Sequence, residues 1–306
     1  MAAMLKYFRN HKWAQLFGLL SPGMLWIVVF FNLPLLIVLF ISFVERGRAG
    51  GIKFPPVYTL ESYTQLFNAC ASQFAGSECD PFLYLGIFGH SARIGLVVTL
   101  LCILVGYPLS FFISKQKPLW RDALMILVII PFWTNFLVRT YALKQVLASE
   151  GLLNSFLLGI GLIGEPLDLL FNEFAVVVGL IYGYLPFAVL PMYASIEKFD
   201  HTLMEAAADL GASPVRAFLR VMLPMTLPGV IAALVLVYVP VVGAFITPDI
   251  MGGGKVEMIG TLINRQFGVA RNWPFGSAMS LMLMLLVLVG VIAYFRSSTE
   301  ETRRAM

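Results

Sequence analysis

The fold is decided by the stretch Glu205-Ala-Ala-Ala-Asp-Leu-Gly211-Ala-Ser-Pro214-Val-Arg-Ala-Phe-Leu-Arg-Val221-Met-Leu-Pro224. It is polar, and it separates two apolar runs, at about 174–194 and 224–247, that are long enough to cross a bilayer as helices. A polar segment between two such helices is expected in water, at one face of a membrane. The stretch therefore indicates a membrane protein with a structured segment at its surface.

The local pattern of this segment predicts a helix, a bend and a second helix. Thr202 and Glu205 have capping-box spacing, in which the threonine hydroxyl accepts from the Glu205 amide and the carboxylate reaches back. Gly211 is expected to end this helix, because glycine adopts the left-handed conformation without strain. Ser213 and Pro214 suit the N-cap and the first residue of the next helix.

The composition excludes an ordinary soluble domain. Of the 306 residues, 59% are hydrophobic and only 12% are charged, about half the charged fraction of a soluble domain. Long apolar runs of this kind predict membrane-spanning helices. The six expected runs are about 17–43, 89–113, 123–147, 174–194, 224–247 and 276–295. The first run is too long for the apolar part of a cleavable signal peptide, so we expect a spanning helix there.

The placement of cations predicts the orientation, because cytoplasmic loops carry the excess of lysine and arginine. Twelve cations lie in the segments that are inside if the N-terminus is inside, against six in the outer loops, which predicts that both termini are cytoplasmic. The inner cations are Lys6, Arg9, Lys12, Lys115, Lys117, Arg121, Lys198, Arg216, Arg220, Arg296, Arg303 and Arg304, and the outer ones are Arg46, Arg48, Lys53, Lys255, Arg265 and Arg271.

The expected organisation is a single membrane domain at 17–296, between a cytoplasmic arm at 1–16 and a cytoplasmic tail at 297–306. Within it, the first outer loop spans 45–88 and the polar cytoplasmic segment spans 195–222. In the outer loop, residues 58–67 suit a short surface helix.

Two cysteines share the first outer loop. Cys70 and Cys79 would lie in an oxidising compartment in this topology. Closing so short a loop stabilises the fold by roughly 2–3 kcal/mol, so we expect a disulfide between them, the alternative being two free thiols in a flexible loop. Cys102, in the second run, is expected to be a free, buried thiol.

The polar segment resembles the loop by which permeases of ABC importers dock on their ATPase. That motif is Glu-Ala-Ala, three residues, glycine, nine residues, an aliphatic residue, one residue and Leu-Pro. The matching positions are Glu205, Ala206, Ala207, Gly211, Val221, Leu223 and Pro224. All the spacings agree, with valine in place of the usual isoleucine.

Other stretches are similar to the spermidine/putrescine permeases within this group. They are 131–142, 185–197, 251–253 and 271–276. The resemblance implies an all-α membrane protein with six transmembrane helices, the MetI-like architecture of type I ABC importer permeases, in the bacterial inner membrane. It also implies a non-catalytic subunit of an importer for polyamines, in which a second permease forms a heterodimer with this chain. Two ATPase subunits and a periplasmic polyamine-binding protein complete that assembly.

Three alternatives to a polyamine permease are open. Similar machines carry opines, phosphonates, thiamine or ferric iron. An ion-coupled secondary transporter would use the third run, interrupted at Pro131, as its site. A membrane-embedded enzyme would need a cluster of polar catalytic residues within the membrane, and the sequence suggests none. The three histidines are scattered without ligand spacing and no phosphate-binding loop is present, so we expect no metal or cofactor on this chain, with ATP and magnesium bound by the ATPase.

The expected docking residues form one surface. Leu203, Ala206, Ala207 and Leu210 have helical spacing and give an apolar face. The small alanines would let the ATPase approach closely, and Glu205 would meet one of its cations. The alternative role of Glu205 is a helix cap alone, worth about 1 kcal/mol. Gly211 and Pro224 complete the expected set, with a plain helix end as the alternative for Gly211.

The third run supplies two expected residues of the translocation pathway. Pro131 is expected to break the helical hydrogen-bond ladder there, followed by Trp133, Thr134 and Asn135 in mid-helix. Polar residues at membrane depth usually face a cavity or another helix. We expect Trp133 and Asn135 to line the pathway and Thr134 to bond a neighbouring helix. For Arg139 we expect snorkelling to the outer interface or pairing with an acid.

The remaining pathway candidates are aromatic or acidic. Tyr182, Tyr184 and Tyr238 offer ring faces to a protonated amine, each worth about 0.5–2 kcal/mol. Tyrosines at helix ends also serve as interfacial anchors, which is the alternative role. Asp249 is expected at the outer end of the fifth helix as the first acid that an entering cation meets. Its alternative role is a cap, or a partner for Arg139 or Arg265.

Overall fold

A computed structural model describes residues 12–48, 50–71 and 80–304. The expected cytoplasmic arm and tail lie partly outside these residues. Every regular element in the described chain is a helix, apart from two isolated β-bridges, which confirms the all-α class. The chain divides into two compact units, one of residues up to Pro81 with Arg265–Met284 and one of Phe82–Asn264 with Leu285 onward.

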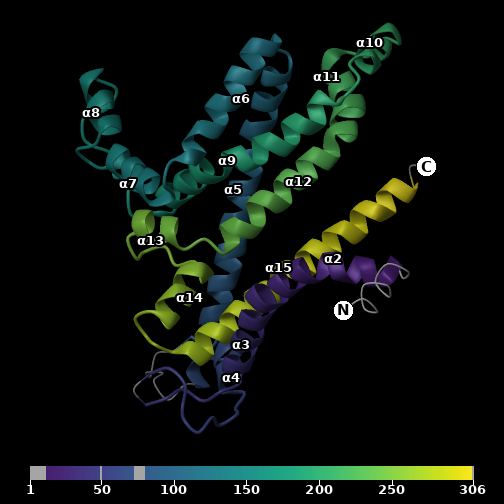
Figure 1. Ribbon diagram of the computed structural model, residues 1–306. Helices are drawn as coiled ribbons and strands as arrows, with labels where there is room; N and C mark the ends of the chain where they lie inside the picture. The colour runs from purple at the N-terminus through teal and green to yellow at the C-terminus, as the bar shows by residue number, and fades with distance from the viewer. Residues whose placement is uncertain (1–11, 49, 72–79, 305–306) are drawn as a thin grey trace. The chain divides into compact units, whose positions relative to one another are not determined.

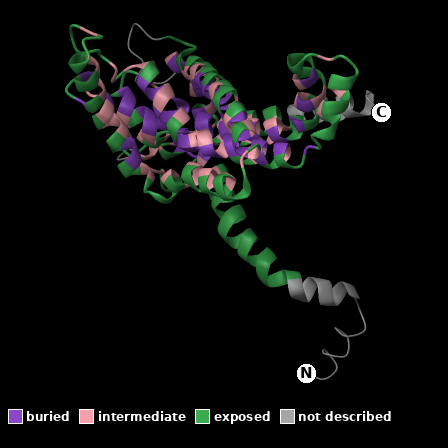
Figure 2. Cartoon of the chain, turned by 90° about the horizontal axis from the view of Figure 1, so that it is seen from above, coloured by how far each residue is buried: buried purple, intermediate pink, exposed green. Residues whose placement is uncertain are grey.

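The first unit begins with one long apolar helix. α2 (Lys12–Ile27) continues through a π-helical turn, η1 (Val28–Asn32), into α3 (Leu33–Ser42). The candidate span Leu20–Ser42 has the highest mean hydropathy of the candidate spans, 2.7, yet its most apolar window is not buried inside the chain. Figure 2 shows this exposure along the N-terminal helix. A helix apolar on all sides needs lipid or another chain around it, as expected for the first spanning run.

The loop that follows, predicted to be the first outer loop, is folded back by main-chain bonds. The amide of Glu45 donates to Val57 and the amide of Thr59 donates to Phe43, at 2.9 and 2.7 Å. The expected surface helix is present as α4 (Glu61–Phe67), followed by the short 3-10 helix η2 (Ala69–Ala71). Cys79 lies outside the described residues, so the Cys70–Cys79 bridge stays a prediction.

The second unit holds most of the helices. They are α5 (Leu83–Ser114), α6 (Pro118–Trp133), α7 (Phe136–Leu147), α8 (Leu152–Gly159), α9 (Glu173–Glu197), α10 (Thr202–Asp209), α11 (Pro214–Ala217), the π-helical η3 (Phe218–Met222), α12 (Leu223–Val242) and α13 (Ile246–Gly252). Two more helices, α14 (Ile259–Phe267) and α15 (Trp273–Arg304), cross the boundary between the units.

The core of the second unit lies where α5, α9 and α12 pack together (Figure 1). Glycines allow these helices to approach: a Cβ at Gly106 of α5 would lie 2.8 Å from the Met192 side chain of α9. The Tyr107 and Thr226 hydroxyls, from α5 and α12, are 2.7 Å apart and satisfy one another in the core. Cys102 is free and buried here, as expected.

The expected spans are confirmed, except that two of them end earlier or break. Five described helices are long and apolar enough to cross a membrane, or six if the bent pair α6 with α7 and α8 is one span. The third run is not one helix, because this pair bends by 97° after Trp133. The fifth span ends at Val242, and residues 246–252 form the separate helix α13.

Candidate functional site

The exposed polar segment forms helix, bend and helix, but its first helix is capped differently from the prediction. The expected capping box is wrong, because Thr202 is already helical and no side-chain cap comes from it. Asp200 takes that role: its carboxylate accepts from the Thr202 amide at 3.0 Å. Hydrogen bonds from the Thr202 amide and hydroxyl hold the pKa of the Asp200 carboxyl below its usual value.

The bend after α10 is a backbone motif centred on Gly211. This residue has φ +83°, its amide donates to Ala208 at 2.9 Å, and the amide of Ala212 donates to Ala207 at 2.9 Å. The pair of bonds is a Schellman motif, which satisfies the last carbonyls of α10 and turns the chain. Ser213 and Pro214 then start α11 at the expected positions, although the serine side chain makes no capping bond.

Most of α10 is exposed, although Met204 packs against the core of the second unit. None of the described residues of α10 is buried, and Leu210 beside it is 90% exposed. Among the residues that the structure describes, the carboxylate of Glu205 has no hydrogen-bond or ion-pair partner. An apolar face and an acid exposed together are suited to contact with another protein.

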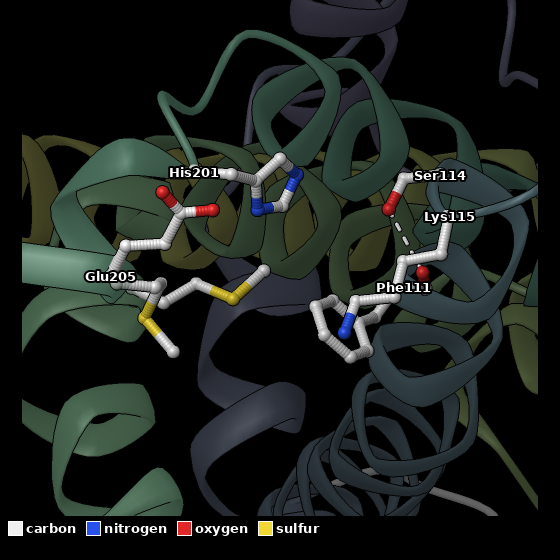
Figure 3. Close-up of a pocket in the computed structure, with 7 residues that line it drawn as sticks. Phe111, Ser114, Lys115, His201 and Glu205 are labelled. Carbon is white, nitrogen blue, oxygen red and sulfur yellow. Dashed lines mark hydrogen bonds between the residues drawn. The ribbon is translucent and has the colours of Figure 1, made fainter. Parts of the chain in front are cut away.

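A cleft of about 380 Å³ lies beside this helix. In Figure 3, His201 and Glu205 lie on one side of it, and Phe111, Ser114 and Lys115, from the end of α5, on the other. The ammonium group of Lys115 is 4.2 Å from the centre of the Phe111 ring. The cleft therefore extends the exposed surface of α10 to the adjoining end of α5.

The second site is the break between α6 and α7. The expectation that Pro131 breaks the ladder is wrong in position, because α6 continues through Pro131 and ends at Trp133. Trp133, Thr134 and Asn135 accordingly lie at the break rather than in mid-helix. Asn135 is the N-cap of α7, where its side-chain oxygen accepts from the Leu137 amide at 2.8 Å. Trp133 is 83% exposed.

The expectation that Thr134 bonds a neighbouring helix is wrong. Its hydroxyl donates to the Pro131 carbonyl of its own helix, at 2.7 Å. The Thr134 amide donates to the same oxygen at 3.3 Å. Both bonds satisfy the end of α6 locally.

Arg139 of α7 also reaches this carbonyl. Its guanidinium donates to the Pro131 oxygen at 2.9 Å, and the residue is only 7% exposed. The expected snorkelling is therefore wrong. The expected pairing with an acid is wrong as well, because no carboxylate in the described chain lies within ion-pair distance of Arg139.

Three aromatic rings surround the buried guanidinium. Its central carbon is 5.4 Å from the ring centres of Phe132 and Phe136 and 5.8 Å from that of Tyr182. These distances are within the range of cation–π attraction. We call Phe132, Phe136 and Tyr182 the aromatic cage. Sequence patterns gave no signal for it, because its rings come from α6, α7 and α9.

The other predicted pathway residues are distributed around this site. The Tyr184 ring is tilted against Phe187 of α9, with the ring centres 6.0 Å apart, and Phe187 in turn meets Phe132 edge-on at 4.6 Å. Tyr238 lies elsewhere, against Gly95 in the contact of α12 with α5. Asp249 is exposed on α13, which corrects its expected position on the fifth helix. The structure thus gathers Tyr182 and Tyr184 with the break but does not bring Tyr238 there.

A polar cluster that the sequence did not suggest ties α5 to α9. Arg93 donates to both carboxylate oxygens of Glu173, at 2.8 and 2.6 Å. One ring nitrogen of His90 lies 3.4 Å from the same carboxylate and the other 3.2 Å from the Glu257 carbonyl. The cluster lies near the start of α5 and at the start of α9, whereas α10 follows the end of α9. It fixes the start of α9 on α5.

Comparison with known proteins gives one family and several close relatives. Residues 103–298 match the model of the family described as binding-protein-dependent transport system inner membrane component. The chain is 41% identical over 279 residues to the spermidine/putrescine transport system permease protein PotB of Haemophilus influenzae, with 91% of this chain and 92% of that protein covered. It is 42% identical over 273 residues to PotB of Escherichia coli, covering 89% of this chain and 94% of the relative.

Solved structures share the fold at low identity. A bacterial ABC transporter involved in the import of the acidic polysaccharide alginate contains a chain with TM-score 0.67 and 18% identity, covering 97% of this chain and 99% of that one. The MetNI methionine ABC transporter, in an inward-facing conformation, contains one with TM-score 0.51 and 17% identity, covering 75% of this chain and 100% of that one.

Proposed function

We propose that this chain is a permease subunit of an ATP-driven polyamine importer. The premise is that it belongs to the binding-protein-dependent transport system inner membrane components, and among them to the PotB-type permeases. It is a multi-pass inner-membrane protein of the MetI-like fold, and it does not itself hydrolyse ATP. Spermidine or putrescine is the proposed cargo, because the relatives at 41–42% identity are named as permeases for these solutes.

The observation that carries the proposal is the exposed segment from α10 to α11. None of the described residues of α10 is buried, and its exposed apolar side chains lie beside Glu205, which has no partner among the residues that the structure describes. Contact with another protein would account for this exposure. The shape fits a docking element: Gly211 and the Schellman motif hold α10 at a fixed angle to the membrane helix that begins with α11. Closure of the ATPases would then move α12 through this rigid contact.

The partners follow from the same premise as proposals. One alginate transporter with the same fold is described in complex with a solute-bound periplasmic protein, and we propose a polyamine-loaded periplasmic protein for this chain. A second, different permease is proposed to face the uncovered sides of the spans, with an ATPase dimer under α10. ATP and magnesium are proposed to bind in the ATPase, and no cofactor on this chain.

A second candidate function is the same machine with an anionic solute. Arg139 is the observation that favours it, because a buried guanidinium without a carboxylate is a ready partner for an anion. An opine or a phosphonate would supply that charge. The identity to the PotB proteins supports the polyamine instead.

The test is the ATPase activity of the reconstituted complex with its binding protein and a panel of solutes. Spermidine or putrescine is expected to stimulate hydrolysis at least several-fold over the solute-free rate. Stimulation by an opine or phosphonate alone, with none by polyamines, would contradict the polyamine assignment and support the second candidate.

A further inference from the structure

We infer that the aromatic cage of Phe132, Phe136 and Tyr182 is a binding site for alkylammonium groups, and that Arg139 occupies it as an internal competitor when no substrate is there. The inference rests on the proposed polyamine function and assigns residues to it. Guanidinium and ammonium groups are attracted to the same ring faces. Both cannot occupy one cage, so the amine has to displace the arginine.

The contacts of Arg139 make such an exchange feasible. The guanidinium is buried but has no carboxylate in the described chain, and burial without a counter-charge is unfavourable. Three ring faces and one carbonyl are what hold it. An ion pair would fix it more firmly than these contacts do.

The helix ends do not depend on Arg139. The Pro131 carbonyl also accepts from the Thr134 hydroxyl and amide, at 2.7 and 3.3 Å. The start of α7 is capped separately by Asn135. If the arginine departs, the backbone groups at the end of α6 and the start of α7 therefore keep their hydrogen bonds. A purely structural role then explains little of why a cation is at this position.

The cage is also accessible to a solute. Phe132 is 38% and Tyr182 43% exposed within this chain, although the arginine between them is buried. The exposed parts of these two rings give an ammonium group a path to the guanidinium. Successive amines of one polyamine, separated by methylenes, would exchange at the rings one after another, without a carboxylate to trap them.

The experiment measures the spermidine affinity of the assembled complex in nanodiscs by calorimetry, without the binding protein. Arg139→Gln removes the competing cation, so the Kd for spermidine is expected to fall about tenfold, the equivalent of one to two cation–π contacts. Arg139→Lys, a weaker competitor without the planar group, is expected to lower it about threefold. The Arg139→Lys variant tests the inference even if the Arg139→Gln complex does not assemble.

A double-mutant cycle separates exchange from a structural effect. In the parent protein, Tyr182→Leu weakens the attraction of the cage for both the Arg139 guanidinium and the spermidine ammonium group. The two effects offset one another, so the change in Kd is small. In the Arg139→Gln background the same change is expected to raise Kd about tenfold, because no competitor is weakened along with the substrate. Tyr141→Leu, on the exposed side of α7, is the control and changes Kd in neither background.

Unchanged or weaker spermidine binding in both Arg139 variants overturns the inference, as does a Tyr182 effect of equal size in both backgrounds. Anion binding that is lost in Arg139→Gln also overturns it and makes Arg139 a ligand. If these outcomes are found in a complex whose ATPase is stimulated by polyamines, the inference about the cage fails and the proposed function stands. A parent complex that does not respond to polyamines refutes the proposed function itself.

Discussion

The helices of the second unit are interrupted in two different ways. After α10 the chain turns through Gly211 by two main-chain bonds between residues five or fewer apart, and no described side chain covers the turn. Between α6 and α7 the residues of the turn are exposed, but the buried Arg139 of α7 reaches back to it and is surrounded by rings from three helices. The first break is rigid by itself and exposed for a partner. In the second, local bonds satisfy the helix ends, and it is the contacts of the buried arginine for which a solute can compete.

Replacing Gly211 tests the first break and is expected to give the largest effect. Gly211→Val puts a β-branched residue at φ +83°, where such residues are strongly disfavoured. The Schellman turn is lost, α10 changes its angle, and ATP-coupled uptake is expected to fall more than tenfold in proteoliposomes.

Gly161 is the matched control for this change. It ends α8 in the same way, with φ +71° and with the same two bonds, from Gly161 to Leu158 and from Leu162 to Leu157. Gly161→Val is expected to retain most of the uptake. Equal losses in both variants would mean that strain alone, rather than the docking contact, is responsible.

The charge of Glu205 is expected to matter next. Glu205→Gln removes an exposed carboxylate that has no partner in the described chain, so the fold is expected to be stable while ATPase binding weakens about tenfold, as for the loss of a charge-assisted contact of about 1.4 kcal/mol. Asp209→Asn, at the other end of α10, is the control. Co-purification of the ATPase measures both, and full retention with Glu205→Gln would refute this contact.

The cap of the second break is expected to have a smaller effect. Asn135→Ala removes the bond to the Leu137 amide, which costs about 1 kcal/mol. Asn172→Ala removes an equivalent cap from α9, where the side chain accepts from Ala175. Thermal unfolding should be lowered similarly in both, but only Asn135→Ala is expected to change the rate of uptake, by about threefold. Equal uptake in both would remove the break from the pathway.

Asp200 is expected to have the smallest effect. Asp200→Ala removes the acceptor of the Thr202 amide at an exposed helix start, so α10 frays slightly and ATPase binding weakens less than threefold. Ser213→Ala is the control, because that serine makes no capping bond. Since hydrogen bonds lower the pKa of Asp200 in the folded state, its contribution is present at neutral pH and lost only as the pH falls through that lowered value. The difference in ATPase binding between the parent and Asp200→Ala should therefore be the same throughout pH 6 to 8.

The difference between the breaks also explains what the sequence predicted. Gly211, Ser213 and Pro214 act through bonds to near neighbours, so their spacing was sufficient to place helix, bend and helix. The six apolar runs predicted the spans, but neither the bend after Trp133 nor the end of the fifth span at Val242. The prediction at Thr202 was wrong because α10 begins at that residue, with His201 as its N-cap, and the side chain that bonds the helix start is Asp200.

Arg139 shows why the rest was not predictable. Its neighbours Phe132 and Phe136 are close in the sequence, but Tyr182 comes from α9, and nothing in the local pattern indicates that the ring faces the guanidinium. An arginine in an apolar run suggests snorkelling or an acid partner, and the structure has neither within its described residues. The cage forms at the 97° bend between α6 and α7, where a ring of α9 joins those of the other two helices.

Transport of polyamines by this chain in an ATP-driven complex can be measured directly. The most direct measurement is uptake of labelled spermidine into proteoliposomes that contain the complete complex, with the loaded binding protein outside and ATP inside. We predict accumulation that requires ATP and that falls at least tenfold with Gly211→Val but not with Gly161→Val. Accumulation without ATP, or no accumulation of spermidine and putrescine while another solute is taken up, would show that this chain is not a polyamine permease of an ATP-driven importer.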